Sequence, residues 1–214
     1  MRYLIVCGGK TDKEFGLNEI KTDGIDAIIA ADSGMDFLYE NGVTPDIIVG
    51  DFDSATTKAL EFFERKGQTE IHRLNPIKDD TDTEYAIRLA IREGARSIVM
   101  LGATGSRIDH VLGNISLLGI GLESKTDISI IDTNNRIRMS DKPVTIEKSA
   151  QYGRFVSLIA LTDDNEVSLK GFKYPVTDYS FDRFTSLGIS NEIVDDHVLI
   201  DIHRGKFIII ESKD

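Results

Sequence analysis

Two aspartates one residue apart follow a short apolar run near residue 50. Residues 47–49 are typical of a buried strand, and Gly50 then leads into Asp51 and Asp53. Two carboxylates this close repel each other unless a divalent cation lies between them. Ligands also bind at the carboxyl ends of strands in open α/β sheets. The spacing therefore predicts a metal site here, with a polar turn that faces water as the structural alternative.

Other acids lie where further strands end or helices begin. Asp32 follows the apolar run 27–31, and it either binds a ligand or caps the helix expected just after it. Asp79, Asp80 and Asp82 lie at the positive end of a second expected helix, where the helix dipole alone favours carboxylates. The dipole does not explain Lys78 beside them. A lysine among acids before a helix start is typical of a phosphate contact next to a metal.

A glycine-containing loop at 102–106 lies between an apolar run and a helix expected to continue to about residue 122. A strand, a glycine-rich loop and a helix start form a phosphate cradle in principle. The loop lacks the Gly-Lys-Ser/Thr ending of a P-loop and the third glycine of the dinucleotide fingerprint. Four candidate side chains lie at the helix start, namely Arg107, Asp109, His110 and Asn114. The last two share one helix face, and a lone histidine is more typical of structure than of ligand binding.

The composition limits the possible functions. The 214 residues include 36 acidic and 25 basic side chains, which gives a net charge of -11 without any basic run. We therefore expect no nucleic-acid binding, and phosphate chemistry would need a cation such as Mg²⁺. Cys7 is the only cysteine, so a disulfide within the chain is excluded. No apolar run is long enough for a signal peptide or a membrane span, so we expect a cytoplasmic protein without membrane association.

The periodicity of apolar residues changes along the chain. Up to about residue 135, apolar strand-like runs alternate with helical patterns, which predicts an α/β domain with a mostly parallel sheet at 1–135. From residue 136, short β-rich runs are separated by glycine and acidic turns, which predicts an all-β sandwich at 136–214. The expected strands of the second domain are 136–146, 154–161, 166–169, 192–194, 198–202 and 206–210.

Five motifs together resemble the thiamine pyrophosphokinase family. They are Ala31-Asp32-Ser33-Gly34, Pro45-Asp46 with Gly50-Asp51-Phe52-Asp53-Ser54, Lys78-Asp79-Asp80-Thr81-Asp82, Gly102-Ala103-Thr104-Gly105-Ser106-Arg107-Ile108-Asp109-His110, and Ser190-Asn191. The resemblance covers nearly the whole chain in order. The first four motifs are specific as a set, whereas Ser190-Asn191 is a weak match alone. The resemblance implies an α/β catalytic domain and a β-sandwich domain. It also implies a homodimer with a site shared between subunits, and Mg²⁺-dependent transfer of a pyrophosphoryl group from ATP to the hydroxyl of thiamine.

The resemblance also implies roles for individual residues. Mg²⁺ would be bound by Asp51, Asp53 and Asp79, with Asp32 beside them as a fourth catalytic carboxylate. Lys78 and Arg107 would contact ATP phosphates, and Asp109 and Asn114 would line the nucleotide. Ser190 and Asn191 would contact thiamine, and the remaining cofactor-binding residues would be Asp82, Thr104 and His110. Ser33 and Ser106 stand where family members often have glycine, and their small size makes both tolerable.

Two other functions remain open at this point. Residues 49–54 also resemble the haloacid-dehalogenase motif, in which Asp51 would be the covalent nucleophile of a phosphohydrolase. That family normally has its motif on the first strand, whereas here complete strands precede it and an all-β domain follows. A nucleotide-sensing module without turnover would need fewer acids than cluster here. The carboxylate that would act as general base stays unassigned.

Overall fold

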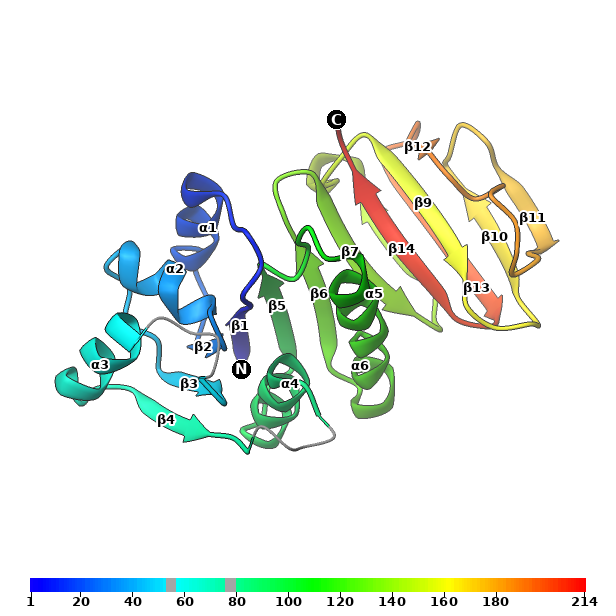
Figure 1. The fold of residues 1–214 in the computed structure, drawn as a ribbon. Coiled ribbons are helices and arrows are strands. Elements are labelled where there is room, and N and C mark those ends of the chain that lie inside the picture. The colour runs from blue at the N-terminus through cyan, green and yellow to red at the C-terminus, as the bar shows by residue number, and fades with distance from the viewer. Residues whose placement is uncertain (53–56, 76–79) are drawn as a thin grey trace. The chain divides into compact units, whose positions relative to one another are not determined.

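The computed structural model describes residues 1–52, 57–75 and 80–214. The chain divides into two compact units, Met1–Thr133 and Asn134–Asp214 (Figure 1). Within the described ranges, no helix is both long and apolar enough to cross a bilayer. The first unit has helices around a parallel sheet, and the second is built from antiparallel strands, as the sequence predicted.

The described residues of the first unit include six parallel strands, which are paired in the order β6-β5-β1-β2-β3-β4 (Figure 1). Their bounds are β1 Arg2–Val6, β2 Ala27–Ala31, β3 Ile47–Gly50, β4 Glu70–Arg73, β5 Ser97–Leu101 and β6 Asp127–Ile131. The chain proceeds outwards from β1 in one direction and then from β5 in the other. The strand order therefore reverses between β1 and β5, which is where open α/β sheets bind ligands.

Helices cover this sheet. They are α1 Lys13–Ile20, α2 Gly34–Glu40, α3 Thr57–Lys66, α4 Asp82–Arg92, α5 Ile108–Leu117 and α6 Gly119–Ser124. Successive residues Leu4, Ile5 and Val6 of β1 are all fully buried, so both faces of the sheet are covered. On one face, Met35 of α2 and Phe63 of α3 belong to the same apolar core as Leu4 and Val6.

Two helix starts and one helix break follow from local sequence. The Asp12 side chain accepts a hydrogen bond from the Phe15 N–H and caps α1, and Thr81 caps α4 in the same way through the Glu84 N–H. The single helix expected to reach residue 122 is instead two helices, α5 and α6, with the break at Leu118. Glycine is the weakest helix former after proline, and two glycines lie within the three residues that follow Leu118.

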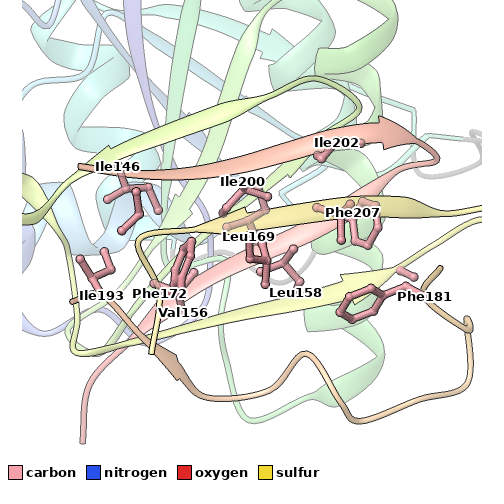
Figure 2. Close-up of a cluster of buried hydrophobic side chains, with 14 residues drawn as sticks. Ile146, Val156, Leu158, Leu169, Phe172, Phe181, Ile193, Ile200, Ile202 and Phe207 are labelled. Carbon is pink, nitrogen blue, oxygen red and sulfur yellow. The ribbon is translucent and has the colours of Figure 1, made fainter. Parts of the chain in front are cut away.

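The second unit contains two antiparallel sheets with the strand orders β12-β9-β14-β7 and β11-β10-β13-β8. The strands are β7 Asn135–Ser140, β8 Val144–Glu147, β9 Phe155–Ala160, β10 Glu166–Lys170, β11 Val176–Ser180, β12 Asn191–Glu192, β13 His197–Arg204 and β14 Phe207–Ser212. A short 3₁₀ turn, Lys148–Ala150, follows β8. Apolar side chains from both sheets, including Leu158, Leu169, Ile200 and Phe207, point toward one another and form a shared core (Figure 2).

The sequence prediction differs from this unit in two strands. The run 136–146 is two strands, β7 and β8, because the chain turns where Ser140 Oγ accepts a hydrogen bond from the Lys142 N–H. Strand β11 was not predicted at all. It lies at the edge of its sheet and four of its five residues are exposed, so it lacks the apolar alternation that marks a half-buried strand.

A buried carboxylate links β7 to β14 within the second unit. The Glu211 side chain is 0% exposed, and it accepts hydrogen bonds from Arg136, Arg138 and the Tyr152 N–H. Burial by itself raises the pKa of Glu211. The hydrogen bonds from Arg136 and Tyr152, together with the charges of both arginines, outweigh burial and lower the pKa below its ordinary value of 4.5. Glu211 is therefore ionised inside the protein.

Candidate functional site

Three carboxylates come together at the carboxyl edge of the parallel sheet. Asp32 follows β2, Asp51 follows the neighbouring strand β3, and Asp82 is the first residue of α4. One carboxylate oxygen of each lies within 4.8 Å of the other two, and all three residues are partly buried. The family resemblance implied that Asp32 would lie beside Asp51, and both residues directly follow strands. It assigned Asp82 to cofactor binding, whereas the structure brings Asp82 into the carboxylate cluster itself.

The backbone around this carboxylate cluster is in unusual conformations. Asp32 has φ 50° and Phe52, directly after Asp51, has φ 61°, both in the left-handed region. Aspartate tolerates this region, but for a bulky residue such as phenylalanine it costs about 1–3 kcal/mol. The Arg73 guanidinium lies 5.3 Å from the Phe52 ring centroid and packs against it. Such strain is typical of functional sites, where the surrounding structure holds the backbone in place.

The donor set of the carboxylate cluster suits Mg²⁺. Mg²⁺ prefers oxygen ligands at about 2.0–2.1 Å in octahedral geometry, so its ligand atoms lie about 3 to 4.2 Å apart. The three oxygens lie within 4.8 Å of one another, an upper limit that includes this range. Two of the predicted ligands, Asp53 and Asp79, lie outside the described residues, as does Lys78. Among the described ranges, this is the one group of three or more acidic, histidine or cysteine side chains close enough to share an ion.

The loop after β1, which contains Gly8 and Gly9, lies at the same carboxyl edge of the sheet, between the loops that follow β2 and β5. A Cβ atom on Gly8 would lie 2.2 Å from Ser33 Oγ, next to Asp32, and one on Gly9 would lie 2.3 Å from the Gly102 carbonyl oxygen. The Gly9 N–H donates to that carbonyl at 2.9 Å. The Gly102 carbonyl belongs to the backbone and cannot rotate away, so only glycine permits the approach at position 9. The loop therefore lies between Ser33, beside the carboxylate cluster, and the glycine-rich loop after β5.

Side chains from two elements hold the glycine-rich loop. The Thr104 hydroxyl lies 2.7 Å from Asp132 Oδ2, and Asp132 directly follows β6. The Asn114 side-chain amide on α5 donates to the Ala103 carbonyl oxygen at 2.8 Å. Two consecutive residues of the loop are therefore fixed from two sides. The structure thus places two of the predicted residues, Thr104 and Asn114, at the predicted loop.

Arg107 and Asp109 form an exposed ion pair at the start of α5, with Nη2 and Oδ2 2.7 Å apart. The hydrogen bond from Arg107 lowers the pKa of Asp109 to about 2. The charges of these two predicted residues therefore partly neutralise each other. His110 follows them and is exposed. The three residues lie beside the glycine-rich loop, and the side-chain contacts that fix that loop come from Asn114 and Asp132.

The two predicted thiamine contacts belong to the second unit. Ser190 has φ 61°, and its N–H donates to Ser157 Oγ at 3.0 Å. Asn191 is 6% exposed, and its amide is used twice on one residue: it accepts from the Tyr174 N–H at 3.0 Å and donates to the Tyr174 carbonyl at 2.9 Å. Tyr174 itself is 61% exposed. The Asn191 side chain thus fixes the backbone of an exposed tyrosine.

Sequence reasoning missed two parts of this site. Asp132 follows an apolar strand just as Asp32 and Asp51 do, so its position at a strand end was an available signal. The glycine pair at 8–9 follows the first strand, but its importance depends on the strand order, which places β1 next to β5. No local pattern in the sequence gives that order.

Comparison with known proteins gives a consistent result along the chain. The family model described as thiamin pyrophosphokinase, catalytic domain, matches residues 21–131, and the one described as thiamin pyrophosphokinase, vitamin B1 binding domain, matches residues 143–207. A Bacillus subtilis protein named thiamine pyrophosphokinase is 35% identical over 188 residues, which cover 87% of each chain.

Solved structures agree with this similarity. The crystal structure of a thiamine pyrophosphokinase from Bacillus subtilis aligns with a TM-score of 0.89 at 31% identity and covers 100% of both chains. A thiamin pyrophosphokinase from Geobacillus thermodenitrificans aligns with a TM-score of 0.87 at 29% identity, covering 100% of this chain and 98% of the other. The likeness therefore extends over both units.

Proposed function

Because the chain belongs to the thiamine pyrophosphokinase family and is an ATP:thiamine diphosphotransferase, we propose that Mg²⁺ bound by Asp32, Asp51 and Asp82 supports this reaction. The observation that carries the proposal is the convergence of these carboxylates, from two neighbouring strand ends and one helix start, to within 4.8 Å. The sequence-based ligands Asp53 and Asp79 remain part of the proposal. The phosphohydrolase and nucleotide-sensor alternatives are not favoured.

The reaction requires one bond to form and one to break. The thiamine hydroxyl oxygen bonds to the β-phosphorus of ATP, the bond from that phosphorus to the oxygen bridging to the α-phosphate breaks, and AMP leaves. The hydroxyl proton passes to a base, for which an aspartate of the site is the available group. Mg²⁺ held by Asp32, Asp51 and Asp82 would neutralise negative charge on the transferred phosphates. By holding the cation in one place, the carboxylates would also orient the reactants.

Roles for the other residues follow from their positions. We assign ATP and metal binding to the first unit, where Lys78 and Arg107 would contact phosphates and Asp109 and His110 would lie beside the nucleotide. Arg107 would share its charge between a phosphate and Asp109, its partner in the structure. Thr104 and Asn114 complete the nucleotide site at the glycine-rich loop. We assign thiamine binding to the second unit, through Ser190 and Asn191. The reaction consumes ATP, which fits a cytoplasmic location.

The proposed reaction has a distinctive pair of products. Protein incubated with Mg-ATP and thiamine is expected to form AMP and thiamine diphosphate in equal amounts, without accumulation of thiamine monophosphate. Chromatography of the mixture measures all of these species. ADP or free phosphate as the main product would contradict pyrophosphoryl transfer. Nucleotide breakdown that continues without thiamine would indicate a phosphohydrolase instead.

We also propose a homodimer whose sites each use residues from both subunits, and subunit exchange tests it. Asp51→Asn and Asn191→Ala homodimers are each expected to be nearly inactive. After mixing and proven exchange, half the dimers are hybrids, and each hybrid has one intact site of two, so activity should return to about a quarter of wild type. If every site lies within one chain, each site keeps a lesion and no activity returns.

A further inference from the structure

Asp132 contacts the glycine-rich loop from the neighbouring strand. Strands β5 and β6 pair in parallel, with Met100 opposite Ile130, so the loop that follows β5 lies beside the residue that follows β6. The Thr104 hydroxyl and Asp132 Oδ2 are 2.7 Å apart, a normal distance for an O–H···O hydrogen bond. The contact is partly buried, where hydrogen bonds to charged groups are stronger than in water.

The direction of this hydrogen bond is fixed by chemistry. An ionised carboxylate has no proton, so the Thr104 hydroxyl donates and Asp132 accepts. The single hydroxyl proton of Thr104 is then committed to Asp132. Toward a ligand, Thr104 has only lone pairs to offer, so it can accept a hydrogen bond but cannot donate one. Phosphate oxygens are acceptors in their turn, so Thr104 is suited to a hydroxyl or amino group of the nucleoside and not to a phosphate.

The contact with Asp132 also orders the glycine-rich loop. The hydrogen bond from Thr104 gives this carboxylate a partner in the loop. Together with the contact from Asn114 to Ala103, it holds two consecutive loop residues between β6 and α5. The loop is therefore already ordered in the free protein, and less conformational entropy is lost when ATP binds.

We propose that Asp132 is a positioning residue of the nucleotide site, which acts through Thr104 by fixing its hydroxyl as an acceptor for a hydroxyl or amino group of the nucleoside. The proposal rests on the proposed function, because it assumes that ATP binds at the glycine-rich loop. It goes beyond that function in naming a residue, its partner and the part of ATP that the partner contacts. The nucleoside offers two kinds of donor, the ribose hydroxyls and the adenine amino group.

Direct nucleotide binding tests the proposal without reference to turnover. Titration calorimetry with ATP, and separately with AMP, gives dissociation constants for the wild type, Thr104→Val, Asp132→Ala and the double variant. Each single variant is expected to weaken binding about three- to tenfold, the effect of one hydrogen bond. The loss should be similar for ATP and AMP, because the contact is to the nucleoside. Both residues act through one hydrogen bond, so their effects should not add. The dissociation constant of the double variant should be at most about twofold higher than that of the single variant that binds less tightly.

Conservative variants and a matched control separate positioning from folding. Asp132→Asn keeps an oxygen acceptor for Thr104, and Thr104→Ser keeps the hydroxyl, so both should bind nucleotides within about twofold of wild type. Asp127→Ala removes the same charge at the opposite, exposed end of β6 and should leave nucleotide binding unchanged. ATP analogues that lack the 2′-hydroxyl, the 3′-hydroxyl or the adenine amino group identify the donor. The analogue without that donor group should bind to Thr104→Val and to the wild type with equal affinity.

Several results would overturn the inference. Wild-type affinity of Thr104→Val for both nucleotides would do so, even if Asp132→Ala did not fold. So would independent, additive losses in the double variant, or a loss seen with ATP but not with AMP, which would place the contact at the β- or γ-phosphate. The proposed function fails separately, if the wild type forms no thiamine diphosphate. A wild type that forms it while Asp132→Ala binds ATP normally contradicts this inference alone.

Discussion

Asp51→Asn is expected to lower the rate of thiamine diphosphate formation at least about a hundredfold. Residues that merely support metal ligands already contribute 10- to 100-fold to metal affinity or activity, and Asp51 is proposed as a ligand itself. The amide keeps the shape of the side chain but removes its charge. Initial rates measured at saturating ATP and thiamine, over a range of Mg²⁺ concentrations, give the loss and show whether added metal partly restores activity.

Thermal stability distinguishes this explanation from a folding defect. In metal-free buffer, Asp32, Asp51 and Asp82 repel one another, so removing one charge should leave the melting temperature unchanged or raise it. Added Mg²⁺ should stabilise the wild type more than the variant, because a ligand stabilises the state that binds it. An Asp51→Asn protein that unfolds at lower temperature without metal would show that the acid is structural.

Glu211→Ala is expected to destabilise the protein by about 3 kcal/mol, without a direct effect on the carboxylate cluster. Removing one partner of a buried ion pair costs about 3–5 kcal/mol because the other charge stays behind. The lower value applies because the Arg136 and Arg138 side chains are 27% and 24% exposed and retain some water. Urea unfolding measures the loss. Glu166→Ala is the matched control, since it removes a surface partner of Arg204 and should cost no more than about 1 kcal/mol.

The same carboxylate gives a pH dependence with a defined sign. The pKa of Glu211 is lowered in the folded state, so the stability it contributes is present above its ordinary value of 4.5 and is lost as pH falls through the folded pKa. The difference in stability between wild type and Glu211→Gln should therefore be largest near neutral pH and shrink below about pH 4.5. A difference that stays constant down to pH 3 would show that the charge of Glu211 does not matter.

The order of the strands is what the sequence could not supply. Apolar runs identified β2 and β3 and showed that Asp32 and Asp51 follow strands, whereas the family resemblance supplied the expectation that the two lie together. The approach of the β1 loop to Gly102 depends on β1 lying beside β5, which is a long-range pairing without a local pattern. Asp132 also follows a strand, but it was not predicted as a site residue because it belongs to none of the five motifs.

The sequence also did not reveal which polar side chains are buried or which groups they bind. Asn191 was predicted to contact thiamine, and that role stays a prediction, but a sequence does not indicate that the side chain is buried and bound to the Tyr174 backbone. Strand β11 was missed because an exposed edge strand has little apolar patterning. Composition and periodicity therefore predicted the two architectures, whereas the partners of individual polar side chains required the structure.

The central claim is that Asp32, Asp51 and Asp82 bind one divalent cation, and titration with Mn²⁺ tests it most directly. Electron paramagnetic resonance measures free Mn²⁺, and Mg²⁺ added afterwards should displace the bound ion from the same site. The wild type and the Asp127→Asn control are expected to bind one Mn²⁺ with equal affinity. Asp51→Asn and Asp82→Asn should each bind it at least about tenfold more weakly, because each lacks one carboxylate ligand. Unchanged Mn²⁺ affinity in both variants would contradict the account, because the cation would then be bound elsewhere.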